Sequence, residues 1–414
     1  MAERRDGPRA HAILIVSART LASQGGSPVR STFLPFHRPS IGPRERERVL
    51  EALDSGWITT GPLAQELARR VAERAGARHG LAVNSATSAL HLALAALGVA
   101  PGDEVVTSAY TFVACANVIE HVGARVVLAD IEPDTLCVDP RALERALTPR
   151  TRALLPVDYA GQPCDYAAIG ALARDRGLPI VEDAAHSLGA AFGGRPVGSL
   201  ATVTAFSFYA TKNVTTGEGG AAVTDDDELA ERMNRLALHG MNRDAWKRYT
   251  ATGSWFYEVV APGFKYNLSD VLAALGLAQL ERFDEMQRRR AERVAQYDAL
   301  LADIPGVRRP HTRPGAVHAH HLYPIALDLE RFTCDRARFI EELRAENIGA
   351  SVHFIPIHFH PYFQGRLGAR EGSFPIAEAA YRRAITLPLF PDMTVRDVED
   401  VAAAVGKIAA HYRR

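Results

Sequence analysis

Short runs of apolar residues alternate with longer amphipathic stretches along most of the chain from about residue 81 onward. Each short run has the length of a strand, and each longer stretch repeats its apolar residues at helical spacing. The predicted strands are 81–83, 104–107, 125–129, 152–157, 178–181, 203–208 and 220–224, and the predicted helices include one ending at Gly98, 111–121 and 166–176. Strands that alternate with helices in this way predict an α/β fold with a mostly parallel sheet.

The pattern changes in the second half of the chain. A long helical pattern covers about residues 269–301, and it includes three consecutive arginines, 288–290, that we expect on a solvated face. After Pro305 and Gly306 the chain turns to short strand patterns rich in His and Pro, which indicates a second domain. We therefore predict a large domain over residues 33–289 and a smaller α+β C-terminal domain over residues 290–414.

The first 32 residues differ from the rest, because they are rich in Arg, Ser and Gly. We expect residues 1–32 to form a poorly ordered extension. Their one apolar run, from Ala12 to Val16, is too short for the core of a signal peptide and for a membrane span. No later stretch reaches membrane length, so we predict a cytoplasmic protein without a membrane partner.

Charge and cysteine spacing exclude further classes of function. The chain has 48 basic and 48 acidic residues, so it lacks the excess positive charge that binding to nucleic acid requires. The four cysteines are widely spaced, and none forms a C-x-x-C pair. A disulfide framework and a metal site are therefore not expected, and the composition fits a reducing compartment.

Lysine is rare in this chain. Only four of the 48 basic residues are lysine, namely Lys212, Lys247, Lys265 and Lys407. Arginine can replace lysine where only a surface charge is needed, but it cannot act as a neutral amine. Lys247 and Lys407 lie in polar or terminal sequence, where we expect exposed side chains. Lys212 and Lys265 are the lysines that chemistry could require.

Ligands of α/β sheets bind beyond the carboxyl ends of the strands, so polar residues at those positions are the candidate site residues. The segment Asn84-Ser-Ala-Thr87 lies between a strand and a helix, where hydroxyl and N–H groups can bind a phosphate. A plain helix N-cap explains the same residues. Asp183 follows the strand 178–181, where a carboxylate requires a charged or hydrogen-bonding partner. A salt bridge within the fold is the alternative for Asp183, and a structural role is the alternative for His186.

The third element of the pattern is Lys212, which follows the strand 203–208 and precedes a Gly-rich turn. Partial burial at this position would lower the pKa of the lysine and make a neutral amine available. A surface lysine is the alternative. A phosphate cradle, an amine and a carboxylate at neighbouring strand ends are together what pyridoxal 5'-phosphate (PLP) requires, because the amine forms a Schiff base and the carboxylate pairs with the ring nitrogen.

These residues belong to a set of motifs that resembles the DegT/DnrJ/EryC1/StrS family of sugar aminotransferases. The resemblance covers about residues 33–410. Its motifs are Thr60-Gly-Pro, Asn84-Ser-Ala-Thr-Ser-Ala-Leu, Tyr110-Thr-Phe, Val181-Glu-Asp-Ala-Ala-His-Ser, Phe206-Ser-Phe-Tyr-Ala-Thr-Lys-Asn, Gly217-Glu-Gly-Gly and Gly263-Phe-Lys-Tyr-Asn-Leu-Ser-Asp. The combination is highly specific, and it implies an aspartate-aminotransferase-like large domain (PLP fold type I) with a smaller C-terminal domain.

The resemblance implies a role for each matching residue. Lys212 would hold the coenzyme and move protons between coenzyme and substrate. Asp183 would hold the pyridine nitrogen, and His186, where many relatives carry Gln, would reach the phenolic oxygen. The other implied coenzyme contacts are stacking by Phe112, phosphate binding by Ala86 through its backbone and by Thr87 and Ser207, and a contact from Asn267 to the phosphate of the neighbouring subunit. That last contact implies a homodimer with shared active sites.

The resemblance also implies a two-step transamination. An amino acid, L-glutamate as in the family, would convert PLP to pyridoxamine 5'-phosphate, which would then aminate the ketone of a nucleotide-linked deoxysugar. Thr60 and two histidines of the segment Ser351-Val-His-Phe-Ile-Pro-Ile-His, His353 and His358, are candidates for substrate contact. Structural roles in a strand are equally expected for both histidines.

The segments Gly217-Glu-Gly-Gly and Lys265-Tyr-Asn resemble those of family members that act at C4. We therefore favour a dTDP- or UDP-linked 4-keto-6-deoxy sugar as substrate and a 4-amino-4,6-dideoxy sugar as product, of the kind found in secondary metabolites or surface glycans. A 3-keto sugar nucleotide or a keto-cyclitol is the alternative substrate.

Three other classes of protein fit less well. A sugar dehydratase of the same family would carry His in place of Lys212. A nicotinamide dehydrogenase would carry G-x-G-x-x-G after the first strand, and residues 84–90 lack it. A non-catalytic regulator with the same fold remains an alternative, although it has no need to keep both Lys212 and Asp183.

Overall fold

The computed structural model describes residues 20–242 and 256–414. Lys247 and residues 1–19 of the predicted extension lie outside the described residues. The large domain contains α1 (Pro43–Asp54), α2 (Pro62–Ala75), β1 (His79–Val83), α3 (Ala86–Ala96), β2 (Glu104–Ser108), α4 (Ala114–His121), β3 (Arg125–Ala129), α5 (Pro140–Ala146), β4 (Thr151–Leu155), α6 (Tyr166–Arg176), β5 (Val181–Asp183), β6 (Ala191–Phe192), β7 (Arg195–Pro196), β8 (Val203–Ser207), β9 (Gly220–Thr224), α7 (Asp227–Ala237) and α8 (Asp270–Glu281). The remaining elements are α9 (Phe283–Leu300), β10 (Val307–Arg308), β11 (Ala316–Val317), β12 (Tyr323–Leu327), α10 (Arg336–Ala345), α11 (Pro361–Leu367), α12 (Pro375–Arg383), β13 (Ala384–Leu387) and α13 (Val395–Tyr412).

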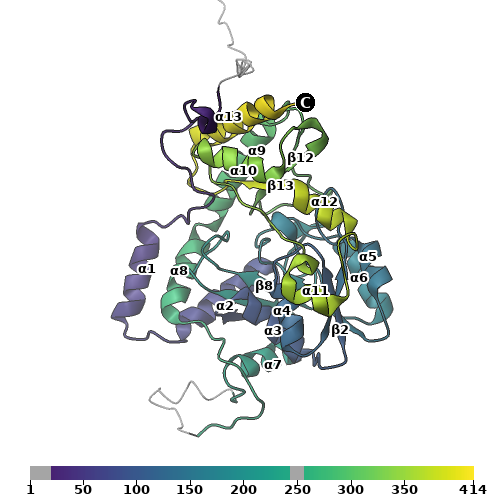
Figure 1. Ribbon diagram of the computed structural model, residues 1–414. Helices are drawn as coiled ribbons and strands as arrows, with labels where there is room; N and C mark the ends of the chain where they lie inside the picture. Colours follow the sequence, from purple (N-terminus) through teal and green to yellow (C-terminus); the bar gives the residue numbers. More distant parts are fainter. Residues whose placement is uncertain (1–19, 243–255) are drawn as a thin grey trace, which may run out of the picture.

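The central sheet is mostly parallel, as the sequence predicts (Figure 1). Strands β3, β2 and β4 pair in parallel, and bridges from β4 and Val157 to the β5 region continue the sheet toward β8. Strand β9 is the exception, because it runs antiparallel to both of its neighbours, β8 and β1. The strand order is therefore β3-β2-β4-β5-β8-β9-β1, and the carboxyl ends of β4, β5 and β8 lie at one edge.

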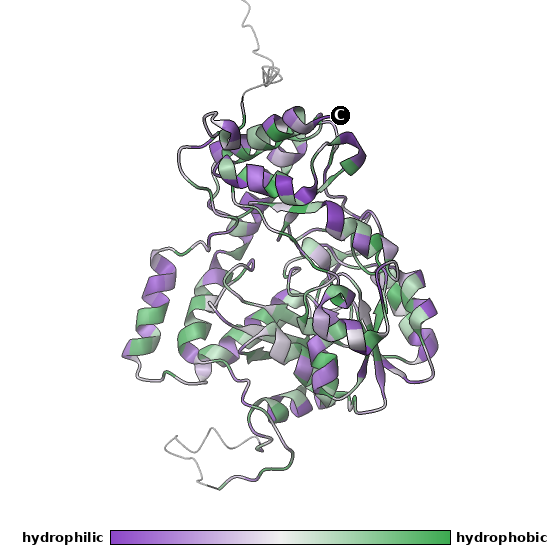
Figure 2. Ribbon diagram, in the orientation of Figure 1, coloured by the Kyte–Doolittle hydropathy of each residue, from purple (hydrophilic) through white to green (hydrophobic). Residues whose placement is uncertain are grey.

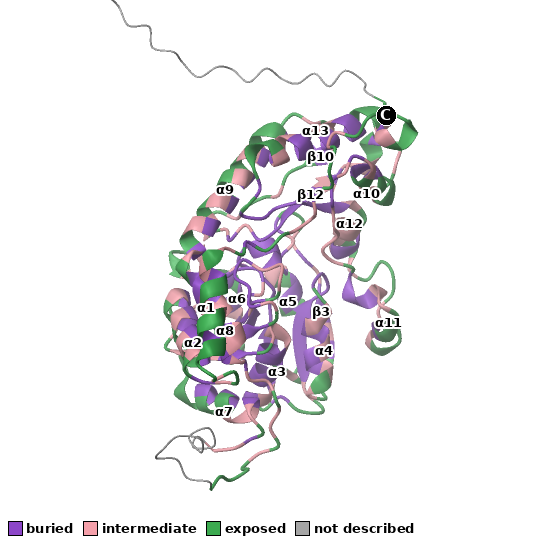
Figure 3. Ribbon diagram, turned by 90° about the vertical axis from the view of Figure 1, so that its left-hand side faces the viewer, coloured by how far each residue is buried: buried purple, intermediate pink, exposed green. Residues whose placement is uncertain are grey.

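Helices cover both faces of this sheet. Side chains alternate along β8 and β9, so that Ala205 and Ala222 join the core beneath α3 and α4, whereas Phe206 and Ala221 join the core beneath α2 and α8. Helix α3 is buried along nearly its whole length, which fixes its first turn at the edge of the sheet. Helix α1 lies outside this layer against α8, and Figure 3 shows it largely exposed.

A three-stranded antiparallel sheet, β10-β12-β13, forms the centre of the smaller C-terminal part, where α9, α10 and α13 pack around it. Figure 2 shows hydrophobic and hydrophilic residues alternating along these helices, and their buried apolar residues form one core with the sheet. The predicted domain boundary at residues 289/290 falls inside α9. Among the described residues, no helix combines the length and the apolar character needed to cross a bilayer.

The helical pattern predicted over residues 269–301 does not form one continuous helix. The chain forms two helices there, and they meet at Arg282. Arg282 has non-helical angles, φ −103° and ψ 4°. Its guanidinium donates to the Glu45 carboxylate at 2.8 Å and to the Ser40 hydroxyl at 3.3 Å. Both partners come from a distant segment at the start of α1, so this contact could not be read from the local helical pattern.

The prediction that residues 288–290 form a solvated helix face is wrong for Arg290. Helical spacing places Arg290 on the buried side of α9 with Met286 and Val294, and only 1% of the residue is exposed. Its guanidinium donates to the Leu389 carbonyl at 3.1 Å, and burial lowers its pKa to about 9. Arg290 therefore fastens α9 to the segment that follows β13.

Residues 20–32, which we expected in the poorly ordered extension, are instead packed against α10 and α13. Leu21 is fully buried, and the Val29 N–H donates to the Glu346 carboxylate at 2.8 Å. Lys407, which we expected to be exposed, is 4% exposed and forms a 2.7 Å ion pair with the same carboxylate. The Lys407 ammonium also donates to the Ser27 carbonyl at 3.0 Å, so a buried charge pair anchors this segment.

Candidate active site

A pocket of about 570 Å³ lies at the carboxyl edge of the central sheet. The ends of β5 and β8, the first turn of α3 and a segment of the C-terminal part line it. The pocket brings together most of the predicted site residues, namely Ala86, Thr87, Phe112, Asp183, His186, Ser207, Lys212 and His353. Residues that are far apart in the sequence thus meet where the strand-end rule places a ligand.

The first turn of α3 forms one end of the pocket. Ser85 is the N-cap, and its hydroxyl accepts a hydrogen bond from the Ser88 N–H at 3.1 Å. The N–H groups of Ala86 and Thr87 belong to the first turn, so they have no acceptor within the helix and remain available to an anion. The N-cap interpretation is confirmed for Ser85, and phosphate binding stays a prediction that is compatible with the cap, because the next two donors are left without an acceptor in the helix.

Gly220 allows the start of β9 to approach this turn closely. A Cβ at Gly220 would lie 2.5 Å from the Ala86 nitrogen and 2.7 Å from the Phe206 carbonyl oxygen, which is closer than real Cβ contacts. The last glycine of the Gly217-Glu-Gly-Gly motif is therefore required for packing. Ser207, at the end of β8, pairs with Gly220 in the sheet and also lines the pocket.

Lys212 lies in a turn after β8, where its backbone N–H donates to the Tyr209 carbonyl at 2.9 Å. The half-buried side chain lines the pocket. Burial lowers the pKa of Lys212 to about 8, and the nearby Asp183 carboxyl partly opposes that shift. About one tenth of the amine is therefore neutral at pH 7, far more than for an ordinary lysine, which favours nucleophilic and base chemistry.

Asp183 ends β5 in a nearly fully buried position. Its carboxylate accepts from the Ala185 N–H at 3.0 Å and from the Cys115 thiol at 2.9 Å. Burial raises the pKa of Asp183, while these donors and the charge of Lys212 lower it. Within residues 20–242 and 256–414 this carboxylate forms no salt bridge, so the structure described here does not support the alternative of a structural ion pair.

The ring of His186 is buried above the same pocket. Its Nδ1 accepts from the Ala160 N–H at 3.3 Å, so a neutral ring carries its proton on Nε2. Burial, with the Lys212 charge, lowers the pKa of His186 well below its usual value and keeps the ring neutral. His186 is thus a hydrogen-bond donor through Nε2.

A second histidine, His321, was not found by the sequence reasoning. Its Nδ1 lies 3.1 Å from the Asn213 amide oxygen, whose amide nitrogen donates to the Ala319 carbonyl at 2.7 Å and to the Gln287 amide oxygen at 2.9 Å. These bonds fix the amide orientation, so His321 donates through Nδ1 and keeps a lone pair on Nε2. The rings of His186 and His321 lie 4.5 Å apart between centroids. The clustering of His318, His320 and His321 was the available signal.

The C-terminal part contributes His353 and Phe354 to the pocket. The carbonyl of His353 accepts from the Tyr110 hydroxyl at 2.6 Å and from the Tyr159 hydroxyl at 2.7 Å. The ring of Phe354, a residue that the sequence reasoning missed, stacks on His186 at 5.8 Å and lies 6.0 Å from the Phe112 ring. The side chain of Phe112 is 58% exposed, so its face is accessible to a planar ligand.

His353 and His358 have different surroundings. His353 lines the pocket, and its Nδ1 lies 3.0 Å from the Thr386 hydroxyl. His358 is fully buried outside the residues that line the pocket, and its Nε2 lies 3.0 Å from the Glu378 carboxylate. The structure therefore brings only His353 into the site.

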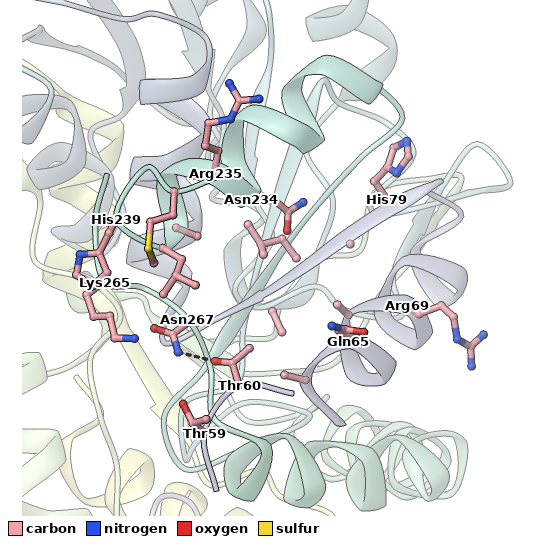
Figure 4. Close-up of a pocket in the computed structure, with 18 of the residues that line it drawn as sticks. Thr59, Thr60, Gln65, Arg69, His79, Asn234, Arg235, His239, Lys265 and Asn267 are labelled. Carbon is pink, nitrogen blue, oxygen red and sulfur yellow. Dashed lines mark hydrogen bonds between the residues drawn. The ribbon is translucent and has the colours of Figure 1, made fainter. Parts of the chain in front are cut away.

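Thr60 and Asn267 do not line the pocket that contains Lys212 of the same chain. They lie in a larger pocket of about 1270 Å³ beside β1, which Figure 4 shows together with Lys265. The Asn267 amide donates to the Thr60 hydroxyl at 2.5 Å, and that hydroxyl donates to the Leu268 carbonyl at 2.6 Å. Asn267 thus belongs to an outward surface of the chain.

The residues of the Lys212 pocket fit PLP. The free N–H groups of α3 suit its phosphate, and the neutral amine of Lys212 suits its aldehyde. Asp183 is a buried carboxylate whose partners in the described part of the chain are a thiol, an N–H group and the Lys212 charge, and it suits a protonated ring nitrogen. His186 offers a donor for the phenolic oxygen.

Comparisons with known proteins give the same class. The model of the DegT/DnrJ/EryC1/StrS aminotransferase family matches residues 39–406. The chain is 49% identical over 380 residues to the spore coat polysaccharide biosynthesis protein SpsC of Bacillus subtilis, which covers 92% of this chain and 98% of that protein. The Streptococcus pneumoniae sugar aminotransferase Spr1654 matches in its PLP-form with a TM-score of 0.85 and 34% identity, over 92% of this chain and 99% of that chain.

Two further solved structures are equally similar. The PMP-form of Spr1654 matches with a TM-score of 0.86 and 35% identity, over 91% of this chain and 99% of that chain. DesI, solved in the presence of its TDP-sugar product, matches with a TM-score of 0.83 and 34% identity, over 94% of this chain and 96% of that chain. The pocket and these similarities define an aminotransferase that uses PLP and acts on sugars. The chain belongs to the DegT/DnrJ/EryC1/StrS aminotransferase family, which confirms the predicted fold, activity class and coenzyme.

Proposed function

We propose that this enzyme transfers an amino group from L-glutamate to the C4 ketone of a dTDP- or UDP-linked 4-keto-6-deoxy sugar. The product is a 4-amino-4,6-dideoxy sugar nucleotide. The observation that carries the proposal is that one pocket is lined by Lys212, the buried Asp183 and the first turn of α3 with its free N–H groups. Similarity to DesI with its TDP-sugar product supports a nucleotide-linked substrate, and the Gly217-Glu-Gly-Gly and Lys265-Tyr-Asn segments support C4.

We propose the following roles for the residues that would hold the coenzyme. The N–H groups of Ala86 and Thr87, with the hydroxyls of Thr87 and Ser207, bind the phosphate. Asp183 binds the ring nitrogen, and Nε2 of His186 donates to the phenolic oxygen. Phe112 covers the ring face. When bound, the coenzyme supplies the aldehyde and the electron-withdrawing ring that amine transfer requires.

Lys212 is the proposed acid and base. Its Nζ accepts the proton that leaves the amino donor, and it returns a proton to the sugar carbon in the second half of the reaction. A pKa near 8 suits both directions, because the amine is then neither firmly protonated nor firmly neutral at the pH of a cell. Nζ of Lys212 is therefore the atom on which both half-reactions depend.

The substrate contacts are also proposals. His353 lines the pocket next to Phe354, and its ring is placed to contact the sugar or a phosphate. Thr60 can contact a substrate only from the outward pocket that it shares with Asn267. We do not propose His358 as a contact, because its Nε2 pairs with Glu378 in the interior.

We propose a homodimer in which Asn267 of one subunit completes the phosphate site of the other. Asn267 lies in the outward pocket rather than in the Lys212 pocket of its own chain, so it can reach a coenzyme only across an interface. Exposed apolar side chains flank this surface at Ile58, Val259 and Val260, which fits a contact between subunits. The four cysteines are free thiols, which fits the proposed cytoplasmic location.

Replacement of Lys212 tests the proposed chemistry. We expect Lys212→Ala to lower turnover by at least about 10⁴-fold, because the amine is both the coenzyme anchor and the proton carrier. Lys212→Arg is the matched variant, since it keeps the positive charge but cannot supply a neutral amine. Borohydride reduction of the wild-type holoenzyme should attach the coenzyme to the peptide that contains Lys212, as peptide mass spectrometry would show. Wild-type turnover by either variant would contradict the assignment.

A substrate panel tests the proposed specificity. Purified 4-keto and 3-keto sugar nucleotides would each be incubated with the enzyme and L-glutamate, and the amino products would be identified by NMR. We expect turnover of 4-keto substrates only. Equal turnover of 3-keto substrates, or turnover of a keto-cyclitol, would reject the C4 assignment and leave the aminotransferase class intact.

A further inference from the structure

Behind the coenzyme pocket, three buried side chains from different elements form a hydrogen-bonded chain. The Cys115 sulfur lies 2.9 Å from one oxygen of Asp183 and 3.4 Å from the hydroxyl of Thr111. Thr111 precedes α4, Cys115 lies in its first turn, and Asp183 ends β5. The exposed fractions are 0% for Thr111, 0% for Cys115 and 5% for Asp183, so water does not compete for these bonds.

The direction of each bond follows from the chemistry of the groups. An ionised carboxylate only accepts hydrogen bonds, so the Cys115 thiol donates its single proton to Asp183. Burial and the neighbouring carboxyl raise the pKa of Cys115 well above its usual value, which keeps the thiol protonated. Because the sulfur has no second proton, the Thr111 hydroxyl donates to it.

We propose that Thr111 and Cys115 are positioning residues that act through Asp183 on the coenzyme ring. The thiol binds one oxygen of the carboxylate and the Ala185 N–H binds the other, so the two donors together fix the orientation of this carboxylate beside the pocket. The hydroxyl of Thr111 polarises the thiol and strengthens its bond to Asp183. This inference rests on the proposed role of Asp183 toward the ring nitrogen.

The thiol also sets how basic the carboxylate is. A thiol is a weak donor, so it stabilises the ionised form of Asp183 less than a hydroxyl would. Asp183 therefore keeps the raised pKa that burial gives it, and it remains a strong acceptor for a protonated ring nitrogen. Without the thiol, only the Ala185 N–H bond and the Lys212 charge would oppose the effect of burial, so the carboxylate would take up a proton at a higher pH and would stabilise a charged ring less.

Infrared spectroscopy of the full-length holoenzyme tests the chain directly, since the S–H stretching band of a thiol moves to lower frequency when the thiol donates a hydrogen bond. The S–H band that is present in the wild type and absent in Cys115→Ala is assigned to Cys115. We expect this band below that of Cys334, the half-buried thiol near α10, and we expect it to move up in Thr111→Val. A Cys115 band at the frequency of a free thiol, or one that Thr111→Val does not move, would overturn the proposal.

Binding and pH measurements test the consequence for the coenzyme. We expect Cys115→Ala to raise the dissociation constant of PLP about tenfold and to shift the acid limb of the pH profile of kcat to higher pH. Cys115→Ser should bind PLP as the wild type does and should shift the acid limb to lower pH than in the wild type, because a hydroxyl is the stronger donor. Cys334→Ala is the control that should change neither. Unchanged binding and pH profile in Cys115→Ala would reject the positioning role. If Asp183→Asn also binds PLP and turns over like the wild type, the proposed role of Asp183 itself fails, so the two failures are distinguishable.

Discussion

At the residue scale, the buried amine of Lys212 couples the stability of the coenzyme-free protein to pH. The pKa of Lys212 is about 8 in the folded chain, against an ordinary value of 10.5. Between these values the unfolded chain binds a proton that the folded chain has released, so stability rises with pH across this window. Below pH 8 both forms are protonated, and the fold carries the full cost of a buried charge.

We expect this coupling to appear when coenzyme-free wild type and Lys212→Met are compared by urea unfolding. Lys212→Met should be the more stable protein at about pH 7, and wild type should recover about 1–3 kcal/mol of the difference by about pH 10. Other titratable groups are present in both proteins, so their contributions cancel in the difference of the free energies of unfolding. Lys265→Met removes an exposed lysine and should show a much smaller change. A difference that stays constant with pH would contradict a lowered pKa at Lys212.

Residue-scale reasoning from the sequence indicated two residues that the structure brings to one pocket, Lys212 and Asp183, and their roles toward the coenzyme stay predictions. Lys212 and Asp183 could be predicted because both follow apolar strands and because the chain contains so few lysines. The same reasoning failed for Arg290 and Lys407, since a charged side chain is normally exposed and its buried partners come from distant segments. Cys115 was recognised only as a free thiol, because its contact with Asp183 exists only in three dimensions.

At the scale of elements, the first turn of α3 carries a structural cap and the proposed phosphate-binding groups. Ser85 satisfies one N–H of this turn, and the next donors face the pocket. We expect Ser85→Ala to lower the free energy of unfolding by about 1 kcal/mol and to weaken PLP binding as well, because the turn loses its cap. Isothermal or absorbance titration with PLP would measure the second effect.

The matched control is Thr394→Ala at the N-cap of α13. Thr394 accepts from the Asp397 N–H at 3.1 Å in a capping box that lies outside the Lys212 pocket. Its loss should cost a similar stability but leave PLP binding unchanged. Equal weakening of PLP binding in both variants would show that the effect of Ser85→Ala is general destabilisation rather than a local change at α3.

The boundaries of elements show what local patterns can and cannot predict. Apolar spacing correctly indicated the strands near residues 104–107, 125–129 and 220–224. The break between α8 and α9 could not be predicted, because Arg282 leaves helical geometry to bind Glu45 from a segment 237 positions earlier. The sequence did indicate the segment that carries Phe354. The contact of Phe354 with His186 could not be predicted, because it depends on the packing of two distant parts of the chain.

At the scale of the whole molecule, the proposed shared active site makes a test by subunit mixing possible. Lys212→Ala and Asn267→Ala should each be nearly inactive as homodimers. In a mixed dimer, the subunit that keeps Lys212 receives the intact Asn267 from its partner, so one of the two sites is complete. Random mixing should therefore restore about a quarter of the wild-type activity.

The outcome of mixing depends on the geometry of Asn267. If Asn267 served the Lys212 pocket of its own chain, each site of the mixed dimer would lack one of the two residues and no activity would return. Mixing Lys212→Ala with Asp183→Asn is the control, since both residues line the same pocket of one chain. In a mixed dimer of that pair, one pocket lacks Lys212 and the other lacks Asp183, so the mixture should stay inactive.

The two tyrosine hydroxyls that share the carbonyl of His353 have a consequence for how ligands enter. Together with the bond from the Ile357 N–H to the Ala109 carbonyl at 3.0 Å, they fasten the segment around His353 to the large domain. A segment fixed in this way does not move as a hinged lid, so the pocket already has its shape before a ligand binds. The conformational entropy of this segment is lost when the protein folds and not when the ligand binds. This favours fast recognition of a rigid sugar ring.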